Sequence, residues 1–188
     1  MKLTSVIMIG AALTLAACSR DNEASNADVA NASVNDALED SGAAPLAPTT
    51  AQAFANVAAA SDRFEIESSN LAATAGQSAA VKSFAAQMVK AHTASTAKLK
   101  STVASLNPPL TINDALSATQ QQMLDGLKGK SGADFDAAYA AAQVAAHQST
   151  LDALNAYAAS GDNAALQEMA TGLVPTVTAH LNMAKGLK

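Results

Sequence analysis

The sequence contains no tryptophan, and phenylalanine and tyrosine together make up only 3% of its 188 residues. Aromatic and β-branched residues are the ones that sheets prefer, whereas alanine, the strongest helix former, dominates this chain. The scarcity of aromatic residues therefore favours helices over strands and predicts an all-α fold.

Basic residues are also scarce. The chain has 11 Lys and Arg against 16 Asp and Glu, a formal net charge of −5. Nucleic-acid binding depends on neutralising phosphates, and adhesion to anionic lipid depends on basic clusters, so an acidic chain without a basic patch argues against both. A glycine-rich phosphate loop, a Gly-x-Ser-x-Gly elbow and a His-Glu-x-x-His motif are absent from the sequence, which argues against the enzyme classes that use them.

The first 17 residues have the pattern of an export signal. One basic residue, Lys2, precedes an apolar stretch over residues 6–17. A permanent transmembrane helix needs about 20 apolar residues, so this stretch is short for that purpose. We interpret residues 1–17 as a signal peptide that is removed, with a retained inner-membrane anchor as the alternative.

The run Leu15-Ala16-Ala17-Cys18 resembles the lipobox of bacterial lipoproteins, and Cys18 is the only cysteine of the chain. A lone thiol in an oxidising compartment can react with other thiols, and acylation of the sulfur prevents this. Acylation also excludes catalysis by the thiol. Ser19 follows where an aspartate would indicate retention in the inner membrane. The sequence therefore predicts that Cys18 is lipidated and that this lipid attaches the protein to a membrane. The predicted location is the periplasmic face of the outer membrane.

Residues 18–51 are expected to be a flexible tether. They are rich in alanine, asparagine, aspartate and serine and contain no aromatic residue, so they cannot bury enough apolar surface to offset their ordering entropy. A fleeting helix over residues 29–38 is the one local structure expected there. Residues 52–188 remain as one domain, large enough for a single core.

The spacing of apolar residues predicts four long helices in this domain. They cover about residues 54–75, 78–105, 133–159 and 163–186, with a kink expected at Pro175 in the last one. The connection over residues 106–132 contains a short helix at 117–127, whose N-terminus Ser117 and Gln120 are expected to cap. Two long hairpins joined by such a crossover form a ferritin-like four-helix bundle; a simple up-down bundle with a helical excursion is the alternative.

Four parts of the sequence resemble one family. They are residues 64–72, residues 81–92, residues 135–139 with His147, and Pro175 with His180. They are similar to the bacterial domain-of-unknown-function family 4142, whose members are described as outer-membrane proteins or lipoproteins. The resemblance covers residues 54–188 and implies a ferritin-like fold and an envelope location, but no settled activity. The family commonly has an aspartate where this chain has Ala91.

The three histidines of the chain, His92, His147 and His180, fall near the middle of three different predicted helices, on or beside the apolar face. Glu65 lies at similar depth on the first helix, whereas Glu67 is about 200° further around it and is expected to face solvent. Ferritin-like proteins build metal sites from inward imidazoles and carboxylates. Glu65, His92, His147 and His180 are thus candidate ligands for a single zinc, copper or iron ion; the alternative is a set of core histidines with satisfied hydrogen bonds.

A di-iron centre is not expected, because it needs a Glu-x-x-His pair on each of two helices. The residues three positions before the histidines are Val89, Val144 and Val177. The sequence therefore favours an envelope-anchored, non-enzymatic binding or structural module in stress resistance or envelope maintenance. Alternatives are a metal-binding protein for storage, sensing or redox chemistry, and a carrier of a hydrophobic ligand. No protein partner can be named from the sequence.

Overall fold

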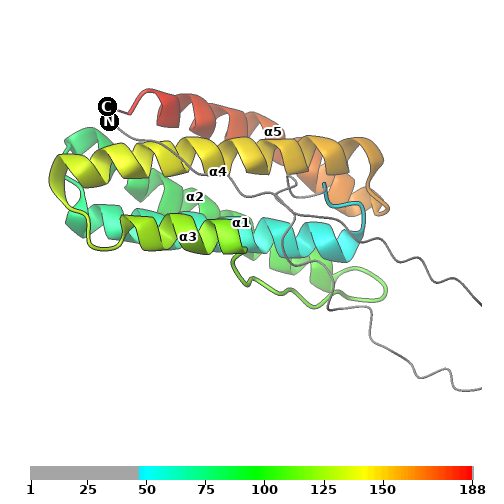
Figure 1. The fold of residues 1–188 in the computed structure, drawn as a ribbon. Helices are drawn as coiled ribbons and strands as arrows, with labels where there is room; N and C mark the ends of the chain where they lie inside the picture. Colours follow the sequence, from blue (N-terminus) through cyan, green and yellow to red (C-terminus); the bar gives the residue numbers. More distant parts are fainter. Residues whose placement is uncertain (1–46, 188) are drawn as a thin grey trace, which may run out of the picture. The chain divides into compact units, whose positions relative to one another are not determined.

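The computed structural model describes residues 47–187, which form five α-helices and no β-strand. The helices are α1 (Ala51–Ala75), α2 (Ala79–Ala104), α3 (Ala118–Leu127), α4 (Gly132–Ser160) and α5 (Ala164–Lys185) (Figure 1). The all-α prediction is confirmed, and each helix lies within a few residues of its predicted bounds. The predicted signal peptide, the predicted acylation site Cys18 and the predicted tether up to residue 46, with its expected helix at 29–38, lie outside the described residues; the last residue assigned to the tether, Ala51, is the first residue of α1.

Side chains that precede the helices explain where they begin. The first N–H groups of a helix have no partner within it, and a hydroxyl or amide oxygen just before the helix can accept from them. Ser117 and Gln120 form the predicted reciprocal capping box of α3. Three further caps accept a hydrogen bond from the first turn of α1, α2 and α5: Thr50, Ser78 and Asn163.

Contacts at the two ends of α1 establish the direction of α4. Phe54, near the start of α1, stacks on Tyr157, near the end of α4, with ring centroids 4.2 Å apart. Gly76, just after α1, pairs with Gly132 at the start of α4. Since α1 and α4 run antiparallel and α1 and α2 form a hairpin, α2 and α4 run in the same direction. The chain must therefore return along the whole bundle between them, which is the ferritin-like crossover that the sequence predicts (Figure 1).

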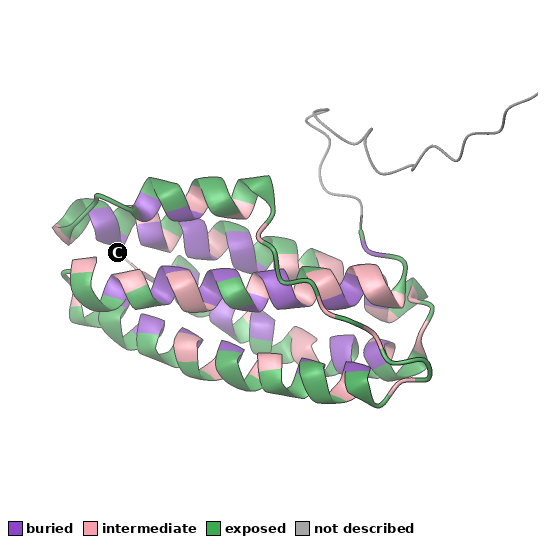
Figure 2. Cartoon of the chain, turned by 90° about the horizontal axis from the view of Figure 1, so that it is seen from below, coloured by how far each residue is buried: buried purple, intermediate pink, exposed green. Residues whose placement is uncertain are grey.

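The interior is divided along the bundle axis. Two large apolar clusters are centred on Phe54, Tyr157 and Leu166 and on Phe84 and Tyr139, and a third, smaller cluster contains Phe64, Leu124, Ala142 and Ala146. On each long helix, buried polar residues occur between the positions that belong to the two large clusters. Besides Ser68 and Ser69 of α1, these residues are Asp62, Glu65, His92, Gln143, His147 and His180, and we call these six the polar layer. Figure 2 shows buried positions along the inward faces of the helices.

Two features of the helices concern the membrane and the proline of α5. Among residues 47–187, no helix combines the length and the apolarity that crossing a bilayer requires. Pro175 lies inside α5, which continues on both sides of it; the kink expected there stays a prediction.

Candidate metal centre

Three imidazoles from three helices meet in the polar layer. His92 comes from α2, His147 from α4 and His180 from α5. One nitrogen of each ring lies within 4.8 Å of the corresponding nitrogens of the other two, and the ring centroids are 5.5 to 5.8 Å apart. All three side chains are buried. The fold thus brings together three residues that are 33 or more positions apart in the sequence.

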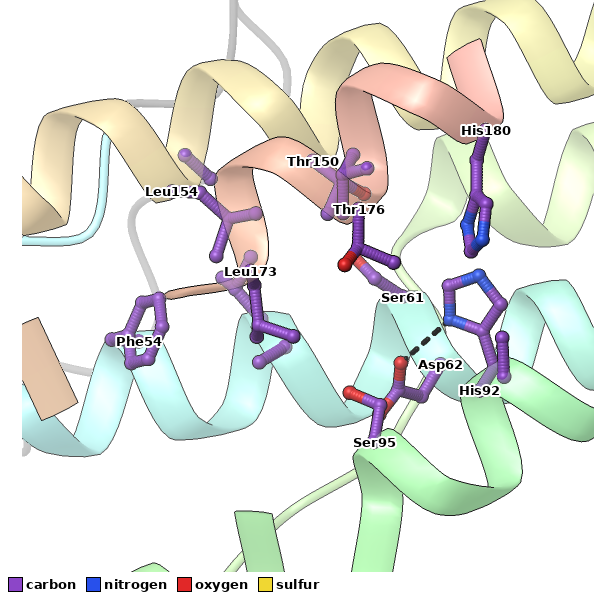
Figure 3. A pocket seen from close by; sticks show the side chains of 15 residues that line it. Phe54, Ser61, Asp62, His92, Ser95, Thr150, Leu154, Leu173, Thr176 and His180 are labelled. Carbon is purple, nitrogen blue, oxygen red and sulfur yellow. Dashed lines mark hydrogen bonds and ion pairs between the residues drawn. The ribbon is translucent and has the colours of Figure 1, made fainter. Parts of the chain in front are cut away.

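A carboxylate sets the orientation of His92. Its Nδ1 donates a hydrogen bond of 2.8 Å to Oδ1 of Asp62, shown as a dashed line in Figure 3. The hydroxyl of Thr96 donates to the other oxygen, Oδ2, at 3.2 Å. An ionised carboxylate only accepts, so the proton of the neutral His92 ring is held on Nδ1. The lone pair of Nε2 is consequently free, an arrangement found around histidine ligands of metals.

The backbone sets the orientation of His147 in the same way. Its Nδ1 donates to the carbonyl oxygen of Gln143, one turn earlier on α4, at 2.9 Å. The side-chain amide of Gln143 in turn donates to the hydroxyl of Ser68 on α1 at 3.1 Å. These bonds leave Nε2 of His147 as the nitrogen that can accept or coordinate.

The nitrogens that remain are buried and without a partner. They are Nε2 of His92, Nε2 of His147 and Nδ1 of His180. Leaving a buried polar atom unsatisfied costs about 1–3 kcal/mol, so three neighbouring rings that each have such an atom call for a shared partner. A metal ion meets this need, since it accepts all three lone pairs. Metal–nitrogen bonds near 2.0–2.1 Å place the ligands of a three-coordinate ion about 3.5 Å apart, which requires only a small inward movement of the rings.

Burial keeps two of the imidazoles uncharged. It lowers the pKa of His147 to about 4, and repulsion from the other two histidines acts in the same direction. Burial also lowers the pKa of His180 to about 4, with a further contribution from His92. For His92, burial opposes the charged form, but the hydrogen bond to Asp62 and the nearby carboxylates outweigh it and raise the pKa. At neutral pH, His147 and His180 therefore present lone pairs without first losing a proton.

Glu65 of α1 lies beside this group but not in it. Its Oε1 is 3.5 Å from Nδ1 of His147, the nitrogen already bonded to a carbonyl, and its Oε2 has no partner. Burial raises the pKa of Glu65 to about 7. Among the described residues, the group of convergent donors consists of the three imidazoles alone. A ligand role for Glu65 stays a prediction, whereas Glu67 faces outward, as expected, and pairs with Arg63 at 2.7 Å.

The residues that orient the imidazoles were not anticipated from the sequence. Asp62 precedes Glu65 by three positions, so both lie on the same face of α1, and this spacing was the available signal. The role of Gln143 rests on its backbone carbonyl, which no residue type reveals. The supporting half of the site therefore appears only in three dimensions.

Two cavities adjoin the polar layer. The smaller, about 60 Å³, is lined by residues of the four long helices, including His92 and His180 (Figure 3). The larger, about 380 Å³, lies between α1, α4 and the crossover, and Glu65, Phe64 and Met123 are among its lining residues.

The fold and this centre define an all-α bundle of ferritin-like topology with a buried three-histidine group. The family described as Domain of unknown function (DUF4142) matches residues 36–187, and the chain belongs to that family. The resemblance seen in the sequence is thereby confirmed. No curated protein matches the chain.

Three solved structures similar to this chain are forms of one protein, CopM. The Cu(II)-bound form has a TM-score of 0.60, the Cu(I)-bound form 0.61 and the silver-bound form 0.59, each at 13% sequence identity. The similarity covers 73–74% of this chain and 94–95% of CopM. At this level of identity the likeness shows a common fold.

Proposed function

We propose that this domain binds one transition-metal ion through His92, His147 and His180, and that copper is the ion it fits best. The observation that carries the proposal is the convergence of three buried imidazoles, with one nitrogen of each ring within 4.8 Å of a nitrogen of the other two, while each ring also has a buried nitrogen without a hydrogen-bond partner. Histidines that only fill a core would have partners for these atoms.

The donor set favours copper over iron and zinc. Imidazole suits copper, zinc, iron and nickel, and among divalent ions copper binds most tightly to a given set of nitrogen ligands. Biological iron sites of related fold use carboxylates, and the three convergent donors here include none. The fold of CopM, which has been seen with Cu(I), Cu(II) and silver, supports copper as the first ion to test. Zinc would need a fourth ligand, from Glu65 or water.

The proposed setting is the bacterial envelope. A lipid on Cys18 would hold the domain at the periplasmic face of the outer membrane, with residues 18–51 as the tether. A domain that binds an ion without turnover could there store or buffer copper and protect the envelope under metal stress. The acidic charge supports attachment through lipid alone and gives no support to nucleic acid as a partner.

Metal analysis of the full-length chain, purified without a histidine tag, tests this function. We expect one equivalent of copper after loading and a melting temperature that rises with added ion, because a ligand that binds only the folded state stabilises it. His147→Ala and the milder His180→Gln should both lose the ion. Gln148→Ala, beside His147 but exposed, should retain it. Protein that stays metal-free, with a melting temperature indifferent to copper, zinc and iron, would refute the proposal.

The larger cavity supports a second candidate function, the carriage of a small hydrophobic ligand. Its volume of about 380 Å³ is within the range of ligand pockets. Phe64, Ala146 and Met123 contribute apolar walls. A fluorescent apolar probe such as N-phenyl-1-naphthylamine should bind with one site per chain, and Ala145→Leu, which adds bulk to the cavity wall, should weaken it. Absence of saturable binding would remove this candidate.

A further inference from the structure

We infer that the ion in this centre keeps one coordination position open, and that this position faces the 60 Å³ pocket and takes a small anion or a water molecule. The inference rests on the proposed metal binding. It goes further in assigning the pocket as the subsite of an exogenous ligand, which distinguishes an accessible centre from a closed structural one.

The number of protein donors is the first reason. Structural zinc-type sites are closed by four protein ligands, whereas sites with three protein ligands leave a position for water or substrate. Three imidazoles converge here, and the one nearby carboxylate without a full set of partners, Glu65, is directed at the bonded nitrogen of His147. Asp62 also lines the pocket, but both of its oxygens already accept hydrogen bonds from His92 and Thr96.

The space beside the imidazoles is the second reason. The pocket reaches His92 and His180, the two ligands on its side of the polar layer. A water molecule needs about 10–15 Å³ of such space, so a pocket of about 60 Å³ holds a water or an anion of a few atoms. The pocket extends to Thr176, which is exposed, and thus connects the buried imidazoles with the surface.

The wall chemistry indicates the class of ligand. Hydroxyls of Ser61, Ser95, Thr150 and Thr176 occur in the lining, and Figure 3 shows them around the space next to His92 and His180. A hydroxyl can donate a hydrogen bond to an anion bound on the metal. Phe54 and Leu154 line the end of the pocket away from the histidines with apolar surface (Figure 3), and the volume of about 60 Å³ limits the ligand to a few atoms.

Azide is a suitable probe, because it is a small anion whose binding to Cu(II) gives a charge-transfer absorption band and a change in the electron paramagnetic resonance spectrum. The full-length chain would be loaded with one equivalent of Cu(II) and titrated with sodium azide. We expect a saturable new band with one azide per copper. Copper that binds with full stoichiometry but shows no spectral response to azide would overturn the inference and leave the proposed function standing. Failure to bind copper at all would overturn both.

A pair of matched variants locates the bound anion. Ala91→Leu adds three carbon atoms to the wall of the small pocket, next to His92. Ala145→Leu adds the same bulk to the wall of the large cavity. We expect both to bind copper, with azide affinity lowered at least about tenfold in Ala91→Leu and unchanged in Ala145→Leu. Equal azide affinity in both variants would overturn the assignment of the small pocket as the anion subsite.

Discussion

The carboxylate of Asp62 on α1 accepts a hydrogen bond of 2.8 Å from Nδ1 of His92 on α2, and both side chains are at least nine-tenths buried. Outer-shell partners of this kind fix the tautomer and ring orientation of a metal ligand and raise its basicity. Asp62 is therefore expected to affect the affinity of the site for a metal ion without being a ligand of that ion.

Asp62→Asn tests this relationship. The change keeps the shape of the side chain but removes its charge, so the affinity for copper should fall by about 10- to 100-fold while one ion still binds. Competition with a chelator of known affinity measures the loss. Asp152→Asn is the matched control, because Asp152 is exposed on α4 and accepts a hydrogen bond from Gln148, one turn earlier on the same helix. An affinity equal to that of the unchanged chain would show that His92 is oriented by packing alone.

The metal-free protein should lose stability in mild acid. Burial lowers the pKa of His147 and of His180 to about 4 in the fold, against an ordinary value of 6.5 for histidine. Below pH 6.5 these two histidines bind protons in the unfolded chain but not in the folded chain. Their contribution to the free energy of unfolding should therefore fall from pH 6.5 to about 4 and then level off. Urea denaturation across this range measures the slope. His180→Gln should make it shallower, and an unchanged slope would contradict the assignment.

Glu65 should affect the pH dependence of stability in the direction opposite to that of His147 and His180. Its folded pKa of about 7 lies above the ordinary value of 4.5 for glutamate, so its contribution to stability is fully present below pH 4.5 and is lost as pH rises to about 7. Glu65→Gln, which cannot ionise, should raise the free energy of unfolding of the metal-free protein at pH 8 by about 1–3 kcal/mol and change it little at pH 4. A variant that is destabilised at pH 8 would mean that the ionised carboxylate is needed for folding.

The stacked pair of Phe54 and Tyr157 should be a main support of one end of the bundle. Both rings are fully buried, with centroids 4.2 Å apart. Phe54→Ala should lower the free energy of unfolding by about 3–5 kcal/mol, since it removes apolar contacts and leaves a cavity. Val57→Ala, one turn away with 39% of the residue exposed, should cost far less. Similar losses in chemical denaturation of the two variants would contradict the described packing.

Asp136 should stabilise the junction between α2 and α4. Its two oxygens accept hydrogen bonds from the backbone N–H groups of Gln77 and Ser78, at 2.9 and 2.8 Å, just before α2. Asp136→Ala should reduce the free energy of unfolding by about 1–2 kcal/mol. Asp134→Ala removes the same charge from the first turn of α4 at an exposed position, so it serves as the control. Equal effects in thermal denaturation would assign the loss to helix charge instead of these bonds.

The fold could be predicted from the sequence because its rules are local. The apolar stripe through Phe54 and Phe64, the cap at Ser117 and the stop at Gly76 each depend on residues a few positions apart. The inward placement of the histidines followed from the same periodicity. What could not be predicted depends on pairs that the sequence separates: Asp62 and His92 are 30 positions apart, and Gln143 and Ser68 are 75. The first of these bonds decides which nitrogen of His92 is free, and helical spacing carries no information about that.

The crossover between α2 and α4 divides the chain into two hairpins, and the candidate ligands are shared between them. His92 belongs to the first hairpin, while His147 and His180 belong to the second. An ion bound by all three histidines would cross-link the two hairpins, whose covalent connection is the crossover. Occupancy of the centre would then determine how readily the two hairpins separate.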